Sequence, residues 1–146
     1  ETAQRFRDFL KKLKFNVKGK EVDVYPLDNP DFNMVDWVLK INGETSLKKT
    51  NELNEKMFNF SSIYDSHVYS NRFITSHTIF RKDTYGDSPV PFIKRIGFSE
   101  DEWNKVGAVT LLRAAIMTPY LNDTKLFDFY SQGIAKSMEK KLNEIL

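Results

Sequence analysis

The sequence contains no cysteine and only two histidines, His67 and His77, among its 146 residues. The absence of cysteine excludes disulfide bonds, thiol catalysis and cysteine-ligated metal. Two histidines cannot build a histidine-rich zinc site within one chain. A phosphate-binding loop, a glycine-rich dinucleotide fingerprint and the motifs of serine hydrolases and zinc proteases are also missing. We therefore predict no metal site and no cofactor.

Long apolar runs are missing as well. No segment approaches the roughly 20 apolar residues of a membrane-spanning helix, and no signal peptide is visible. These absences predict a cytoplasmic protein with no membrane partner. The first residue is Glu rather than Met, so the sequence is compatible with a longer parent protein.

The composition is that of an ordinary globular domain. Hydrophobic residues make up 40% of the chain and charged residues 29%, with a formal net charge of +2. At this length one hydrophobic core is expected, so we predict a single domain over residues 1–146. Lys, Asn and Phe are frequent, which is typical of a protein from an AT-rich genome. The small net charge permits a nucleic-acid partner without indicating one.

The first half of the chain shows helical and strand patterns in alternation. Apolar spacing predicts a helix over residues 2–14, and alternation around Lys18-Gly19 predicts a hairpin over residues 15–26. Residues 29–43 favour a helix that is capped by Asn29, with a strand over 36–42 as the alternative. Another helix is predicted over residues 46–60.

Residues 61–98 are compatible with more than one structure. The β-branched and aromatic residues of 72–81 favour a strand, although a helix that begins near Ile63 could also continue through them. Gly86, Pro89 and Pro91 predict a loop over residues 83–91, followed by a short strand over 90–98.

The strongest local pattern lies in residues 99–117. Ser99 and Glu102 form a capping box, and Phe98 and Trp103 have the spacing of a hydrophobic staple. Beyond Lys105 the residues are apolar or small on nearly all sides. This pattern predicts one helix over 99–117, buried on most of its surface.

A final helix is predicted over residues 124–145, with Asp123 as its cap. At about 22 residues it would be about 33 Å long, which is the size of a small domain. Its end is therefore expected to pack on a second subunit or on sequence outside this chain. The complete pattern predicts an α+β fold, mainly helical with a small antiparallel sheet. An all-α fold is the alternative if residues 63–81 are helical.

Arg72 and His77 form an Arg-x4-His pattern, which resembles the motif of HEPN-type ribonucleases over six residues. The resemblance implies a helical dimer interface at which the two side chains meet. The Arg would stabilise charge on the scissile phosphate, and the His would assist proton transfer. Phe73 departs from the family pattern, which usually has a polar residue after the Arg. A metal-independent ribonuclease is accordingly our alternative function.

Basic side chains are concentrated near the N-terminus and could form one surface with others further along the chain. Such a surface would favour nucleic acid or an acidic protein as partner. The favoured hypothesis is a non-catalytic binding or assembly module, with the C-terminal helix as a possible site of homo-oligomerisation. Its candidate nucleic-acid-binding residues are Arg5, Arg7, Lys11, Lys12, Lys14, Lys48, Lys49 and Arg113.

Overall fold

The computed structural model describes residues 2–28, 33–61, 75–115 and 123–146. Its elements are helix α1 (Thr2–Lys12), strands β1 (Lys14–Val17), β2 (Lys20–Pro26) and β3 (Met34–Ile41), helix α2 (Leu47–Ser61), strand β4 (Ser76–Arg81), helices α3 (Lys82–Tyr85), α4 (Val90–Arg95) and α5 (Glu100–Val106), strand β5 (Ala108–Ala115) and helix α6 (Thr124–Ile145). Within these ranges, every helix is too short or too polar to cross a membrane.

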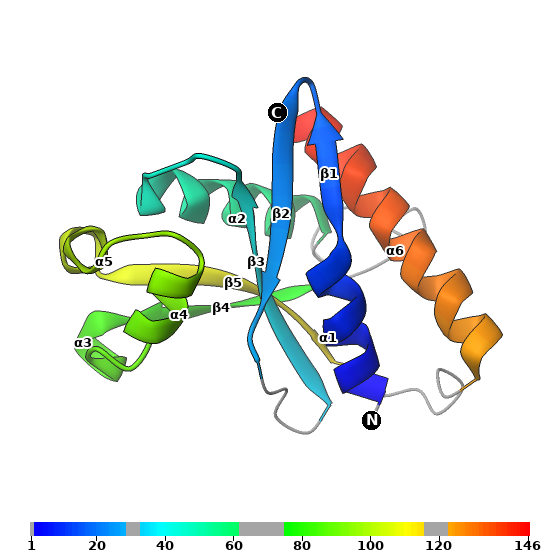
Figure 1. Ribbon diagram of the computed structural model, residues 1–146, viewed down its shortest axis with the longest axis horizontal. Helices are drawn as coiled ribbons and strands as arrows, with labels where there is room; N and C mark the ends of the chain where they lie inside the picture. The colour runs from blue at the N-terminus through cyan, green and yellow to red at the C-terminus, as the bar shows by residue number, and fades with distance from the viewer. Residues whose placement is uncertain (1, 29–32, 62–74, 116–122) are drawn as a thin grey trace.

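The centre of the fold is a five-stranded antiparallel sheet in the order β1-β2-β3-β5-β4. The sheet is strongly twisted, so that β4 and β5 run across the direction of β1 and β2 (Figure 1). The fold is therefore α+β. The α+β class agrees with the main reading of the sequence, although the sheet is larger than the small one that we predicted, and the all-α alternative is wrong.

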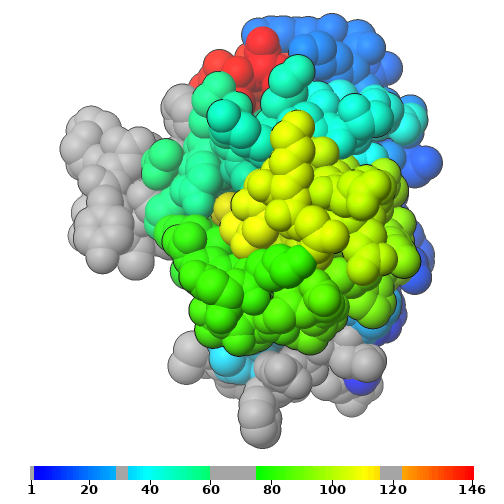
Figure 2. Space-filling view, turned by 90° about the vertical axis from the view of Figure 1, so that its left-hand side faces the viewer, coloured from blue at the N-terminus to red at the C-terminus, as the bar shows by residue number. Residues whose placement is uncertain are grey.

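Each face of the sheet carries its own hydrophobic core. One core joins α1, α2 and α6 to the sheet and contains Phe6, Leu10, Val24, Trp37, Met57, Leu112, Met138 and Leu142. The other joins α4 and α5 to the sheet and contains Val38, Leu47, Ile93, Phe98, Trp103, Val109 and Leu111. Figure 2 views the molecule from the side of this second core, where residues 75–110 form a continuous surface beside the start of α2.

The helix predicted over residues 29–43 is wrong in its described part, because β3 occupies Met34–Ile41. Neighbouring residues of β3 point to opposite cores, Trp37 to the first and Val38 to the second. A strand buried on both faces loses the polar–apolar alternation by which strands are usually found. The alternative strand reading was therefore the correct one. Asn29, its predicted cap, lies outside the described residues.

The same reason explains the larger error, at residues 99–117. Half of the predicted capping box is present, since Ser99 Oγ accepts a hydrogen bond from the Glu102 amide at 3.1 Å, but the Glu102 carboxylate accepts from the Leu47 amide at 3.0 Å. However, α5 ends at Val106, and Gly107 closes it in the left-handed conformation with φ 71°. The apolar run that follows is the central strand β5, with Leu111 in one core and Leu112 in the other.

Two further local predictions are wrong. Residues 83–91 are not simply loop, because α3 lies within Lys82–Tyr85. Residues 90–98 do not form a strand, because α4 covers Val90–Arg95 with a proline at its N-terminus. By contrast, the predicted hairpin is present, with positive φ at both Lys18 and Gly19. The strand at 76–81 and the helix capped by Asp123 are confirmed as well.

Two asparagines of α2 connect the splayed ends of β3 and β5. These strands pair only between Met34–Trp37 and Leu112–Ala115. Beyond that point Asn54 bonds the amide and the carbonyl of Leu39, each at 2.9 Å. Asn51 in turn bonds the Ala108 carbonyl and the Thr110 amide. The two side chains thus satisfy backbone groups that a separating sheet would otherwise leave unpaired.

Candidate functional site

A pocket of about 310 Å³ lies where the end of α1, strand β2 and helix α4 meet. Strand β2 turns Asp23 and Tyr25 to the same face, because residues two apart on a strand share a face. Helix α1 ends beside this strand, and α4 brings in a guanidinium group. The lining residues are Lys11, Leu13, Lys14, Asp23, Val24, Tyr25, Pro26 and Arg95.

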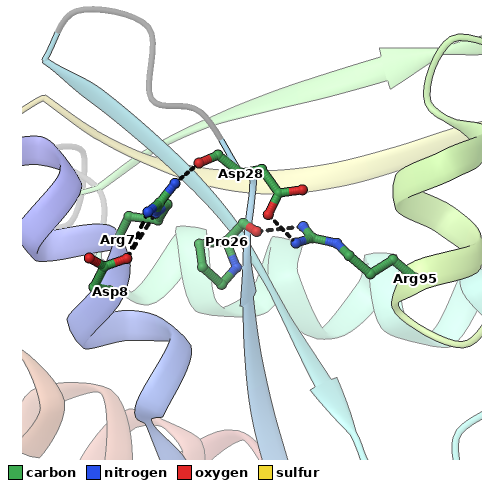
Figure 3. A network of polar contacts seen from close by, with 5 residues as sticks. All are labelled: Arg7, Asp8, Pro26, Asp28 and Arg95. Carbon is green, nitrogen blue, oxygen red and sulfur yellow. Dashed lines mark hydrogen bonds and ion pairs between the residues drawn. The ribbon is translucent and has the colours of Figure 1, made fainter.

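Arg95 connects the pocket to a network of polar contacts at its edge (Figure 3). Its guanidinium donates to the Pro26 carbonyl at 2.7 Å and to the Asp28 carboxylate at 2.5 Å. From the other side, Arg7 of α1 donates to the Asp28 carbonyl oxygen and to the Asp8 carboxylate. The chain after β2 is therefore held between α1 and α4, and the position of Arg95 is fixed.

Tyr25 is the titratable side chain in this pocket with a shifted pKa. Burial raises the pKa of its phenol above the ordinary value of 10.0. The charge of Asp23, a hydrogen bond to Asp23 and the charge of Glu21 raise this pKa further. The phenol is therefore protonated at neutral pH, where it can donate a hydrogen bond but cannot act as a general base. The phenol hydrogen is already engaged with the Asp23 carboxylate, so the pocket presents this tyrosine–carboxylate pair beside the cations of Lys11, Lys14 and Arg95.

The predicted nucleic-acid-binding residues have different surroundings in the structure. Arg5 lies over the Phe127 ring at 4.4 Å from its centroid, and Arg7 belongs to the network just described. Lys11 and Lys14 line the pocket. The remaining lysines, Lys12, Lys48 and Lys49, are exposed on α1 and α2.

Arg113 is paired within the sheet. It lies directly opposite Asp36 on β3, and its Nε and Nη2 donate to the two carboxylate oxygens at 2.6 and 3.0 Å. This bidentate pair accounts for a charged residue within an apolar strand. Arg113 was among the candidate nucleic-acid-binding residues, and its guanidinium is engaged by Asp36.

His77 lies on strand β4 and not on a helix, so the local geometry that the ribonuclease resemblance requires is absent. Its imidazole packs on Phe58 with ring centroids 3.9 Å apart, and Nε2 lies 3.8 Å from a Glu55 carboxylate oxygen. Arg72 lies outside the described residues. In the part of the chain that the structure describes, no group of three His, Cys, Asp or Glu side chains could hold a metal ion.

Sequence reasoning missed Tyr25 and the pocket around it. The alternation of residues 20–26 already placed Glu21, Asp23 and Tyr25 on one face of a strand. Arg95 could not be added in this way, because 69 residues separate it from the Pro26 carbonyl that it contacts.

Comparisons with known proteins match the chain along nearly its whole length. A family model described as "Tyrosine decarboxylase, C-terminal" matches residues 2–142. The chain is 62% identical to an L-tyrosine decarboxylase of Enterococcus faecium over 146 residues, which are 100% of this chain and 24% of that protein. L-tyrosine decarboxylases of Enterococcus faecalis and Levilactobacillus brevis are 46% and 45% identical, each over 99% of this chain and 23% of the relative. The chain thus spans about a quarter of the length of these relatives.

These matches overturn both functions that we predicted from the sequence. The relatives are catalytic enzymes that act on an amino acid, so neither a nucleic-acid-binding module nor a metal-independent ribonuclease is supported. An acidic protein partner is not supported either. The basic residues misled the prediction because charge near the N-terminus was taken as a surface, whereas the arginines among them are engaged within the fold.

Proposed function

This chain belongs to the tyrosine decarboxylase C-terminal family, and from that membership we propose that it forms the C-terminal part of an enzyme that decarboxylates L-tyrosine. The observation that carries the proposal is the 62% identity to the Enterococcus faecium enzyme along all 146 residues. Because the chain covers 24% of that protein, the rest of the enzyme would contribute to the reaction as well.

The proposed reaction breaks the bond between the α-carbon of L-tyrosine and its carboxylate. Carbon dioxide leaves, and a proton is taken up in its place to give the amine. A catalyst of this reaction must bind the amino acid and stabilise the negative charge that develops on the α-carbon as carbon dioxide leaves. It must also exclude competing reactions at that carbon. Within the complete enzyme, this chain would contribute a stable folded unit in which two hydrophobic cores hold the helices on the sheet.

A chimeric enzyme tests the proposal directly. The matching segment of the Enterococcus faecium enzyme would be replaced by residues 1–146 of this chain, and release of carbon dioxide from L-tyrosine would be measured. We expect activity comparable to that of the parent enzyme, whereas a version without the segment should be inactive. A chimera with the parent's circular dichroism spectrum and no activity on L-tyrosine would contradict the proposal.

A cytoplasmic location and self-association through the C-terminal helix are predictions that belong to the same proposal. The length of α6, 22 residues, supports a contact of this helix beyond the present chain. Sedimentation velocity of the complete enzyme over a wide concentration range would test self-association. A monomer at every concentration would rule it out.

A further inference from the structure

The first turns of α6 expose an apolar surface that the fold itself does not use. Phe129 is 73% exposed, Tyr130 52% and Leu126 39%. The three residues follow the i, i+3, i+4 spacing and therefore share one face of the helix. The rings of Phe129 and Tyr130 meet edge to face with centroids 5.5 Å apart. The opposite face is buried through Phe127 and Ser131.

This cluster stands out from the remaining surface of the described residues. Only Met34 and Tyr85 are comparably exposed large hydrophobic residues there, and each lies on a different element. Single exposed apolar residues are ordinary, but a contiguous group with two aromatic rings is typical of an interface. Exposed Lys125 and Asp128 flank the cluster, in the manner of a polar rim around an apolar centre.

The position of the cluster indicates what covers it. Arg5 and Phe9 of α1 both contact the Phe127 ring, with Phe9 and Phe127 centroids 6.5 Å apart. The start of α1 and the start of α6 therefore lie at the same end of the molecule (Figure 1). In the relatives most of the polypeptide lies outside the matched segment, and the family description places that segment at the C-terminus. A preceding polypeptide would enter at the start of α1, at the same end of the molecule as the cluster, and would have to pass around α6 to reach its exposed face.

We propose that the α6 cluster of Leu126, Phe129 and Tyr130 docks on the preceding part of the same decarboxylase polypeptide. The proposal rests on the proposed function, because that function supplies the preceding part. The partner surface would be an apolar depression that accepts two aromatic rings and offers a hydrogen-bond acceptor to the Tyr130 hydroxyl. This contact would hold the C-terminal segment in a fixed orientation on the rest of the enzyme.

Tyrosine footprinting of the complete enzyme tests whether the cluster is covered. Tyr85 on α3 is 50% exposed and Tyr130 is 52% exposed, so the two phenols form a matched internal pair. We expect hydroxyl radicals to modify Tyr130 severalfold less than Tyr85 when the chain is part of the complete enzyme. Equal modification of both residues would overturn the proposal.

A photo-crosslinker in place of Phe129 identifies the covering surface. Crosslinked peptides from the polypeptide that precedes Thr2 within the same chain are expected. Crosslinks to residues 2–146 of a second copy would overturn the proposal in favour of self-association. Neither readout involves L-tyrosine. An enzyme that shows protection and the expected crosslinks without decarboxylating L-tyrosine would therefore refute only the proposed function.

Discussion

The segments 99–115 and 123–145 both begin with a capped helix, yet only the second remains helical to its end. In the first, Gly107 ends the helix after seven residues and the chain continues as a central strand. In the second, a long helix lies across one edge of the molecule (Figure 1). The difference shows that a cap determines where a helix starts. How far the helix extends depends on whether the following residues are buried on one side, as in α6, or on both sides, as in β5.

The largest expected difference between the two segments is the cost of removing a leucine. Leu112 on β5 is fully buried in the first core, so Leu112→Ala should lower the free energy of unfolding by about 2–5 kcal/mol. Leu126→Ala on α6 should cost under ~1 kcal/mol, since that side chain is partly exposed. Urea unfolding of both variants measures the difference. Equal losses would show that the start of α6 is as buried as β5.

The ion pair of β5 should give the next largest effect. Arg113→Met leaves the Asp36 carboxylate without its bidentate partner in a mostly buried position, and we expect a loss of about 1–3 kcal/mol. Lys125→Met on the exposed face of α6 serves as the control and should change stability by less than ~0.5 kcal/mol. If both variants unfold like the parent, the pair does not contribute measurably to stability.

Two glycines provide a comparison in which the effects have opposite signs. Gly107 has φ +71°, so Gly107→Ala should cost about 1–2 kcal/mol from backbone strain alone. Gly133 lies within α6, with nothing within 4 Å of an added Cβ, so Gly133→Ala should stabilise by about 0.5–1 kcal/mol. Thermal unfolding of the two variants tests this. A stabilising Gly107→Ala would mean that the helix continues through residue 107, as the sequence pattern alone suggested.

Gly107 also shows how far sequence reasoning reached for this fold. A single glycine is a known sign of a helix end, but the prediction overlooked Gly107 because apolar and small residues follow it. Val38, Leu111 and Leu112 were placed on predicted helices and not on strands, because strands buried on both faces show no alternation. Amphipathic elements such as α1, the β1–β2 hairpin and α6 were predictable for the opposite reason.

The candidate site shows the same division. Asp23 and Tyr25 share a predictable strand face, so one wall of the pocket could be inferred from the sequence. The other wall depends on Arg95, which contacts Pro26 and Asp28. Along the chain, β3, α2, β4 and α3 lie between these residues, so local sequence patterns could not predict the contact. The charge pattern alone could not separate cations that are engaged within the fold from cations that are available to a partner.

The smallest expected effects concern the two caps. Ser99→Ala removes one hydrogen bond to the Glu102 amide and should cost about 1 kcal/mol of global stability, because α5 holds Trp103 in the second core. Asp123→Ala removes bonds to the Lys125 and Leu126 amides, yet the residues of that first turn are exposed. We therefore expect it mainly to fray the start of α6, with faster hydrogen exchange at residues 125 and 126 and a smaller change in global stability.

If Asp123→Ala instead costs as much as Ser99→Ala in the isolated chain, the start of α6 is already held by the domain itself. If that cost arises only in the complete enzyme, the turn that carries the α6 cluster is stabilised by the surface that covers it.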